Sequence, residues 1–146
     1  MIEVKFQDWE AILFLTQELE NFEKDKAIKA GLGAAARVFL QAGKQTLRER
    51  MKYRTGITGN LLSSFTVRVK KSKPGALSGF KWPQGNHAHL VDLGTVERFR
   101  KGNKSTGAMP ANYFWTDTRD SAGPNAIDKL YRGVESAVDR INEGRR

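Results

Sequence analysis

Two histidines, two adjacent serines and one aspartate are the side chains of this sequence that come closest to a reactive pattern. His87 and His89 form an H-x-H pair. On a strand both rings would face one side and suit two metal ligands, but no third ligand is evident. Ser63 and Ser64 would need a histidine base and an acid, and no nucleophile-elbow sequence surrounds them. Asp92 has no second acid at a fixed spacing that would complete an acid–base pair.

Other reactive patterns are missing from the sequence. It contains no cysteine, which excludes a disulfide framework, a thiolate metal site and a cysteine nucleophile. It also lacks the glycine-rich signatures of phosphate-binding loops and dinucleotide-binding folds. We therefore predict that the protein is not an enzyme, with no catalytic, cofactor-binding or metal-binding residue.

Length and charge suggest the general class of protein. The 146 residues predict a single domain, 1–146, and carry a formal net charge of +9. No apolar run approaches the roughly 20 residues that span a bilayer, and no signal peptide is visible. The expectation is a protein made in the cytoplasm, without a membrane partner.

The charge is distributed unevenly along the chain. Residues 1–25 hold seven acidic and two basic side chains, a net charge of −5, which leaves +14 for residues 26–146. The basic side chains are either a solvated surface or contacts to phosphate, which need charge but no base-reading chemistry. The candidates for phosphate contact are Arg68, Lys70, Arg98, Arg100, Lys101 and Lys104.

Helical periodicity marks three segments that must position these side chains. Asp8 is a plausible N-cap for a first helix that reaches Phe22, and a longer helix is predicted over 23–51. Glycines and alanines within that long helix leave a smooth flank on which another backbone can pack closely. A last helix is predicted to open at Pro124, and residues 143–146 are expected to fray.

Strand patterns lie between these helices. Residues 2–6 alternate, 65–69 alternate more clearly, and 77–82 return after a hairpin turn at 72–75. A short element is predicted over 87–93, and 98–108 are read as a mobile basic loop. This order predicts an α+β fold with N-terminal helices and a C-terminal helix packed on a small antiparallel β-sheet.

Three sequence blocks in this order resemble one family. They are Thr58-Gly59-Asn60-Leu61-Leu62-Ser63-Ser64-Phe65, His89-Leu90-Val91-Asp92-Leu93-Gly94-Thr95 and Met109-Pro110-Ala111-Asn112-Tyr113-Phe114. Together they resemble the gene-product-ten-like neck family of long-tailed bacteriophages and prophages, over roughly residues 8–142. Its members are described as tail-completion, head–tail joining or minor tail proteins.

The resemblance implies a virion structural protein that assembles as a ring at the head–tail junction and lets DNA pass. Its partners would be further copies of itself and other phage neck and tail proteins, and its location the tail or neck of the virion. The motif positions, which are candidate interface residues, are Thr58, Gly59, Leu61, Ser64, Asp92, Gly94, Thr95, Pro110 and Phe114. The alternative function is non-specific nucleic-acid binding, suggested by the basic excess.

Two motif residues have local interpretations that the sequence leaves open. Asp92 either caps a turn or pairs with a basic group such as Arg98 or Arg100, in its own chain or a neighbour's. The run from Tyr113 to Trp115 either buries two aromatic rings and leaves one at the rim, or forms a subunit contact.

Overall fold

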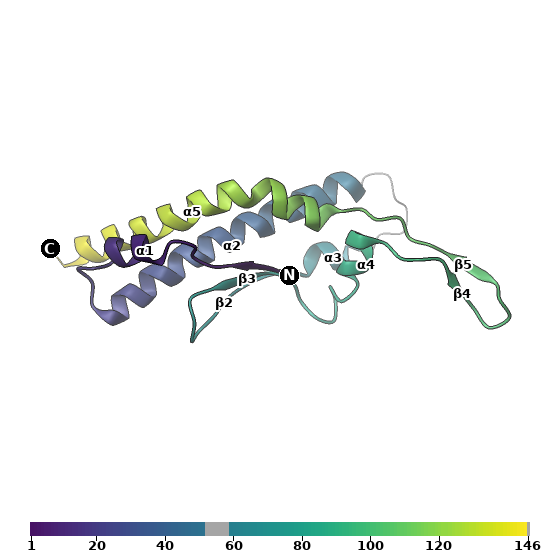
Figure 1. Cartoon of the computed structure of the whole chain (residues 1–146), viewed down its shortest axis with the longest axis horizontal. Helices are drawn as coiled ribbons and strands as arrows, with labels where there is room; N and C mark the ends of the chain where they lie inside the picture. The colour runs from purple at the N-terminus through teal and green to yellow at the C-terminus, as the bar shows by residue number, and fades with distance from the viewer. Residues whose placement is uncertain (52–58, 146) are drawn as a thin grey trace.

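Two long helices, α2 (Asn21–Met51) and α5 (Phe114–Gly144), dominate the computed structural model, which describes residues 1–51 and 59–145 (Figure 1). A short helix, α1 (Trp9–Leu15), precedes them, and Asp8 caps it by accepting a hydrogen bond from the Ala11 amide. The cap is as predicted, but the helix ends at Leu15 and does not reach Phe22. The remaining helices are α3 (Asn60–Ser63) and α4 (Ala88–Leu93).

A three-stranded antiparallel sheet packs on α2. Its strands are β1 (Ile2–Val4), β2 (Phe65–Val69) and β3 (Ala76–Phe80), in the order β1-β3-β2. The predicted alternation sets the register, so that the inward-facing Val4 and Val69 both pair with Ala76. Together with the long N-terminal and C-terminal helices, this sheet gives the predicted α+β fold. Among the described residues, no helix combines the length and apolar character needed to cross a membrane.

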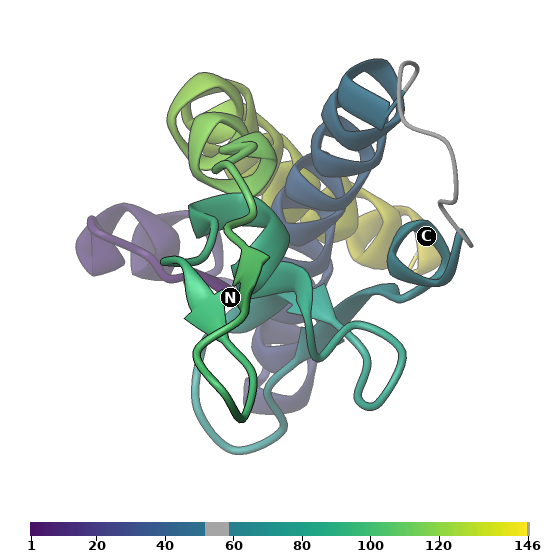
Figure 2. The ribbon, with the colours of Figure 1, turned by 90° about the vertical axis from the view of Figure 1, so that its right-hand side faces the viewer.

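The two long helices cross in close contact, as the end-on view shows (Figure 2). At the crossing, Gly31 of α2 lies against Gly133 and Val134 of α5. A Cβ atom built on Gly31 would come within 2.6 Å of the Leu130 carbonyl oxygen. The smooth flank predicted for the long helix is therefore where α5 packs.

An aromatic cluster fills the space between the sheet and the helices. Phe65 and Phe80 of the sheet meet Phe114 and Trp115 of α5, with ring centroids between 4.7 and 6.5 Å apart. Gly43 of α2 provides the room, since a Cβ there would lie 2.6 Å from the Trp115 ring. The cluster fixes the N-terminal end of α5 over the sheet.

The last helix differs from its predicted bounds at both ends. It begins at Phe114 and not at Pro124, which lies inside it. Pro124 removes one backbone donor, but Ala122 and Ala126 on either side of it are buried. This packing stabilises a continuous helix across the proline. At the other end the helix continues to Gly144, and Arg145 pairs with Glu23. Fraying of residues 143–146 stays a prediction, and Arg146 lies outside the described residues.

Candidate assembly surface

The second and third sequence blocks are held together by backbone hydrogen bonds between residues 91–95 and 109–113, and we call this contact the joint. The Thr95 amide donates to the Met109 carbonyl at 2.9 Å, and the Met109 amide donates to the Thr95 hydroxyl at 2.9 Å. Gly94 has a φ of 75°, and a Cβ there would lie 2.7 Å from the Ala111 amide nitrogen. Glycine is therefore required for both the backbone conformation and the close approach. Pro110 lies within this joint and is exposed.

Asp92, which belongs to this joint, caps the N-terminus of α5. Its Oδ1 accepts hydrogen bonds from the Trp115 and Thr116 amides at 2.9 and 3.0 Å, and its Oδ2 accepts from the Thr116 hydroxyl at 2.8 Å. The carboxylate is buried and lies where the helix dipole favours negative charge. Of the two roles left open for Asp92, capping is the one observed. An ion pair with Arg98 or Arg100 is not seen in the described part of the chain.

Arg50, at the C-terminal end of α2, also contacts the joint, and it is not among the candidate residues of the sequence analysis. Its guanidinium donates to the Asn112 carbonyl and lies 2.6 Å from Asp117 Oδ2. One arginine thus ties α2 both to the third block and to the first turn of α5. The charges themselves were visible in the sequence, but nothing in their spacing could indicate a contact across 62 and 67 positions.

The aromatic run of the third block buries two of its rings and leaves one at the rim, which is the first of the two interpretations given above. Phe114 is fully buried and Trp115 nearly so, whereas Tyr113 is 50 % exposed at the edge of the joint. Phe114 is therefore a core residue, and Tyr113 is the one aromatic of the three that faces solvent.

The first block meets the third through Phe65, which packs against Phe114, while its other described residues serve local structure. Gly59 has a φ of 77° at the start of α3, Leu61 is buried, and the buried Ser64 donates its hydroxyl hydrogen bond to the Leu61 carbonyl. Ser63 bonds in the same way to Asn60. Thr58 lies outside the described residues.

The two histidines do not form the geometry that a metal pair needs. Residues 88–93 form the helix α4 and are not extended, with Ala88 and Asp92 buried one turn apart. His87 is the N-cap residue and His89 lies within the helix, so they no longer share a face as they would on a strand. In the part of the chain that the structure describes, no group of three His, Asp or Glu side chains could hold a metal ion.

A β-ribbon extends from the joint. Residues 98–108, predicted as a loop, contain two antiparallel strands, β4 (Arg98–Phe99) and β5 (Ser105–Gly107). Gly102 and Asn103, both with positive φ, form the tip and allow the reversal. The short, irregular strands explain why no alternating pattern was visible in the sequence.

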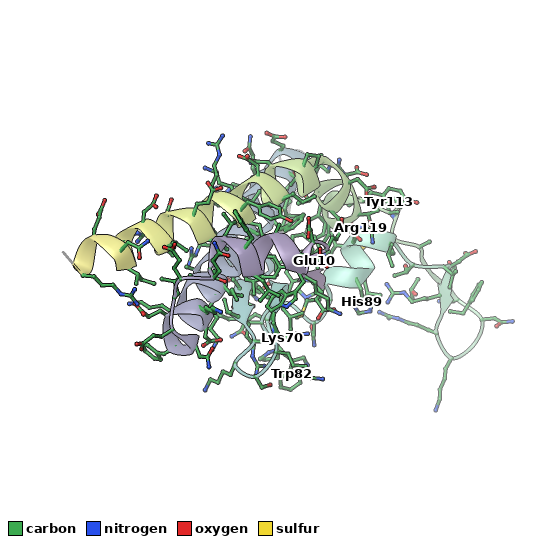
Figure 3. All side chains as sticks on the ribbon, turned by 60° about the vertical axis from the view of Figure 1, so that its left-hand side comes forward. Glu10, Lys70, Trp82, His89, Tyr113 and Arg119 are labelled. Atoms are coloured by element: carbon green, nitrogen blue, oxygen red, sulfur yellow. The ribbon has the colours of Figure 1, made fainter. Side chains whose placement is uncertain are left out.

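The ribbon projects away from the body. Every residue from 96 to 108 is exposed, and Figures 1 and 3 show the ribbon and its side chains standing clear of the helices. Its four basic side chains take part in no ion pair of the described chain. Phe99 is 59 % exposed and Val96 82 % exposed. We call residues 96–108 the assembly ribbon.

The six candidate phosphate contacts lie in two separate places. Arg98, Arg100, Lys101 and Lys104 belong to the assembly ribbon, whereas Arg68 and Lys70 lie on β2 and just after it, closer to the middle of the molecule (Figure 1). Arg68 is exposed, but the Lys70 ammonium group already donates to the Glu3 carboxylate on β1. The six do not make one continuous basic patch.

The Glu3 ion pairs give a testable pH effect. The hydrogen bond from Lys70, followed by one from Lys5, holds the pKa of Glu3 below its ordinary value. Its stabilising contribution is therefore present above the unfolded-state pKa and is lost as the pH falls through the lowered folded-state pKa. We expect Lys70→Met to raise the pKa of Glu3 in a carboxyl carbon NMR titration, and Lys5→Met to raise it less. An unchanged pKa in Lys70→Met would contradict the pairing.

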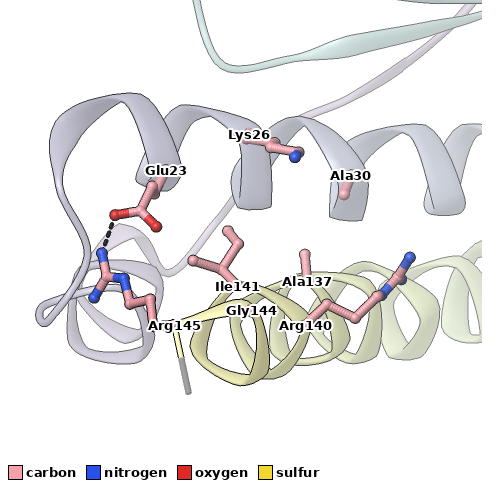
Figure 4. A pocket seen from close by; sticks show the side chains of 8 residues that line it. All are labelled: Glu23, Lys26, Ala30, Ala137, Arg140, Ile141, Gly144 and Arg145. Carbon is pink, nitrogen blue, oxygen red and sulfur yellow. Dashed lines mark hydrogen bonds and ion pairs between the residues drawn. The ribbon is translucent and has the colours of Figure 1, made fainter.

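Two pockets in the described part of the chain lie near the two ends of α5. One of 450 Å³ lies between the N-terminal end of α2 and the C-terminal end of α5, with an apolar floor that includes Ala137 and Ile141 and charged groups at its rim (Figure 4). Two of those rim charges, Glu23 and Arg145, already pair with each other. Another, of 520 Å³, is an open hollow at the base of the assembly ribbon, lined by 93–96 and 108–111.

Comparisons with protein families, with curated proteins and with solved structures give no match for this chain.

Proposed function

We propose that the protein is a structural subunit of a phage or prophage neck or tail, which assembles as a ring at the head–tail junction. The observation that supports this proposal best is the assembly ribbon. An isolated two-stranded ribbon is marginally stable in water and gains stability when it packs on another surface. Within the described chain no such surface covers it, so the packing partner is expected to be another molecule.

The joint supports the same proposal. Asp92, Gly94 and Thr95 of the second block, with 109–113 of the third, hold the base of the assembly ribbon against α2 and α5. Two of the three blocks that resemble the phage family thus build the base from which the ribbon projects. These residues act by positioning a contact surface, and the mechanism consists of interface formation without chemical turnover.

The proposed function predicts that removing the assembly ribbon prevents ring assembly but leaves folding of the subunit intact. In a variant in which a short Gly-Ser turn replaces residues 97–107, we expect the melting temperature to change by less than about 4 °C, because the ribbon packs on nothing in the monomer. We expect rings of the intact protein in negative-stain micrographs at high concentration and none of the variant. Rings that persist without the ribbon, or an intact protein that never assembles at any concentration, would refute the proposal.

Non-specific nucleic-acid binding is the second candidate, favoured by the four unpaired basic side chains of the ribbon. It predicts that the isolated monomer binds DNA with an affinity that falls steeply with salt, and that loss of the ribbon abolishes this binding. Absence of binding at low salt would remove it. Fluorescence anisotropy with a labelled duplex distinguishes this outcome from ring assembly.

A further inference from the structure

The end of the molecule opposite the assembly ribbon has the complementary chemistry. Figure 1 places α1 and the N-terminal end of α2 at one end of the long axis and the ribbon at the other. Exposed acidic and apolar side chains gather there, and we call them the acidic corner: Glu10, Leu13, Phe14, Glu18, Glu20 and Phe22.

The acidic corner presents large apolar side chains to solvent. Phe14 is 70 % exposed and Phe22 is 79 % exposed, more than Phe99 of the ribbon. Glu10, Leu13 and Phe14 share one face of α1, since residues three and four apart are neighbours on a helix. An aromatic surface with charges beside it has the composition of a protein interface.

The glutamates of the corner are free to meet a basic partner. Glu10, Glu18 and Glu20 take part in no ion pair of the described residues, whereas the neighbouring Glu23 and Asp25 are already paired with Arg145 and Lys29. The three unpaired acids are therefore opposite in charge to the four unpaired basic side chains of the ribbon.

We propose that the assembly ribbon of one copy docks on the acidic corner of the next copy, with Phe99 packed against Phe14 and Phe22 and the basic side chains facing the glutamates. The contact joins two different surfaces at opposite ends of the subunit, so it is heterologous and propagates into a ring or an open chain. Ribbon-to-ribbon pairing is disfavoured because it would place like charges together. This inference rests on the proposed function, because it names the two surfaces of the subunit contact.

The absence of cysteine allows a direct test by site-directed cross-linking. Thr106→Cys places a thiol on the ribbon of one chain, and Gln17→Cys places one beside the corner of another; both positions are exposed. With a short bis-maleimide at high protein concentration, we expect this pair to cross-link about tenfold more than Thr106→Cys with the control Ser136→Cys, an exposed position on α5. Equal yields, or a dominant link between two Thr106→Cys ribbons, would overturn the proposal.

Charge exchange separates a true contact from damage to the fold. Glu18→Lys with Glu20→Lys in the Gln17→Cys chain should lower the yield about tenfold, and Arg98→Glu with Arg100→Glu in the Thr106→Cys chain should do the same. Combining the two reversed chains should restore the cross-link, because the signs again match. A yield that stays low in this combination contradicts the docking, provided that both variants keep the melting temperature of the parent.

The outcomes distinguish this contact from the proposed function. Rings without the Thr106–Gln17 cross-link would overturn the contact and leave the proposed function standing. The cross-link in open chains that never close would support the contact and refute ring assembly. Neither cross-links nor assembly at any protein concentration would overturn both.

Discussion

Gly31→Ala is expected to destabilise the protein by about 2–3 kcal/mol, although alanine is the better helix former. The added Cβ would lie 2.5 Å from Val134 Cγ2 and 2.6 Å from the Leu130 carbonyl oxygen. The side chain of Val134 is fully buried and the carbonyl belongs to α5 itself, so relief requires the two helices to move apart. Chemical denaturation followed by circular dichroism measures the change in the free energy of unfolding.

Gly33→Ala is the matched control, two residues along the same helix. A Cβ there would meet Arg37 Nη2 at 3.4 Å and Val69 Cγ2 at 3.5 Å, which are ordinary contacts. We expect this variant to be as stable as the parent or more stable by up to about 1 kcal/mol, from its higher helix propensity. If both variants lost the same stability, the close crossing of α2 and α5 would not be the cause.

Asp92→Ala is expected to lower the free energy of unfolding by about 2–3 kcal/mol, because it removes three accepted hydrogen bonds at the start of α5. Two of the donors are backbone amides of the helix's first turn, which would lose their partners next to the aromatic cluster. Asp92→Asn keeps one side-chain oxygen and should fall between the parent and the alanine variant. Thermal unfolding followed by near-ultraviolet circular dichroism reports both the stability and the packing of Trp115.

Asp120→Ala provides the comparison for Asp92. This aspartate lies on the same helix, but it is exposed and its ion pair is with the exposed Arg119. Exposed pairs of this kind contribute little, so we expect a change of at most about 0.5 kcal/mol. Asp92→Ala with a stability equal to that of Asp120→Ala would show that the cap is dispensable.

The fold was predictable from sequence where one local pattern decides the structure. Alternation of Phe65, Val67 and Val69 indicated β2, and the apolar periodicity of 23–51 indicated α2. The start of α5 was missed because Pro124 resembles a helix opening. Burial of Phe114 and Trp115 against distant strands outweighs that local signal.

The candidate site was predictable only in part, because its contacts join distant segments. Asp92 was identified with capping as one of its two roles, but its partners, the amides of Trp115 and Thr116, lie 23 and 24 positions away. The basic composition of the ribbon was visible, whereas its two strands were not, since they are short and have no buried face to impose alternation. Its exposure depends on the whole fold, which no local window of sequence reveals.

The crossing of Gly31 with Gly133 also has a consequence for biosynthesis. These residues are about 100 positions apart, so the helix pair closes only after the segment that forms α5 has left the ribosome. Helix α1, which carries part of the acidic corner, packs on α5 as well. The docking proposed above would therefore require the closed helix pair, because α5 supports both α1 and, through Asp92, the base of the ribbon.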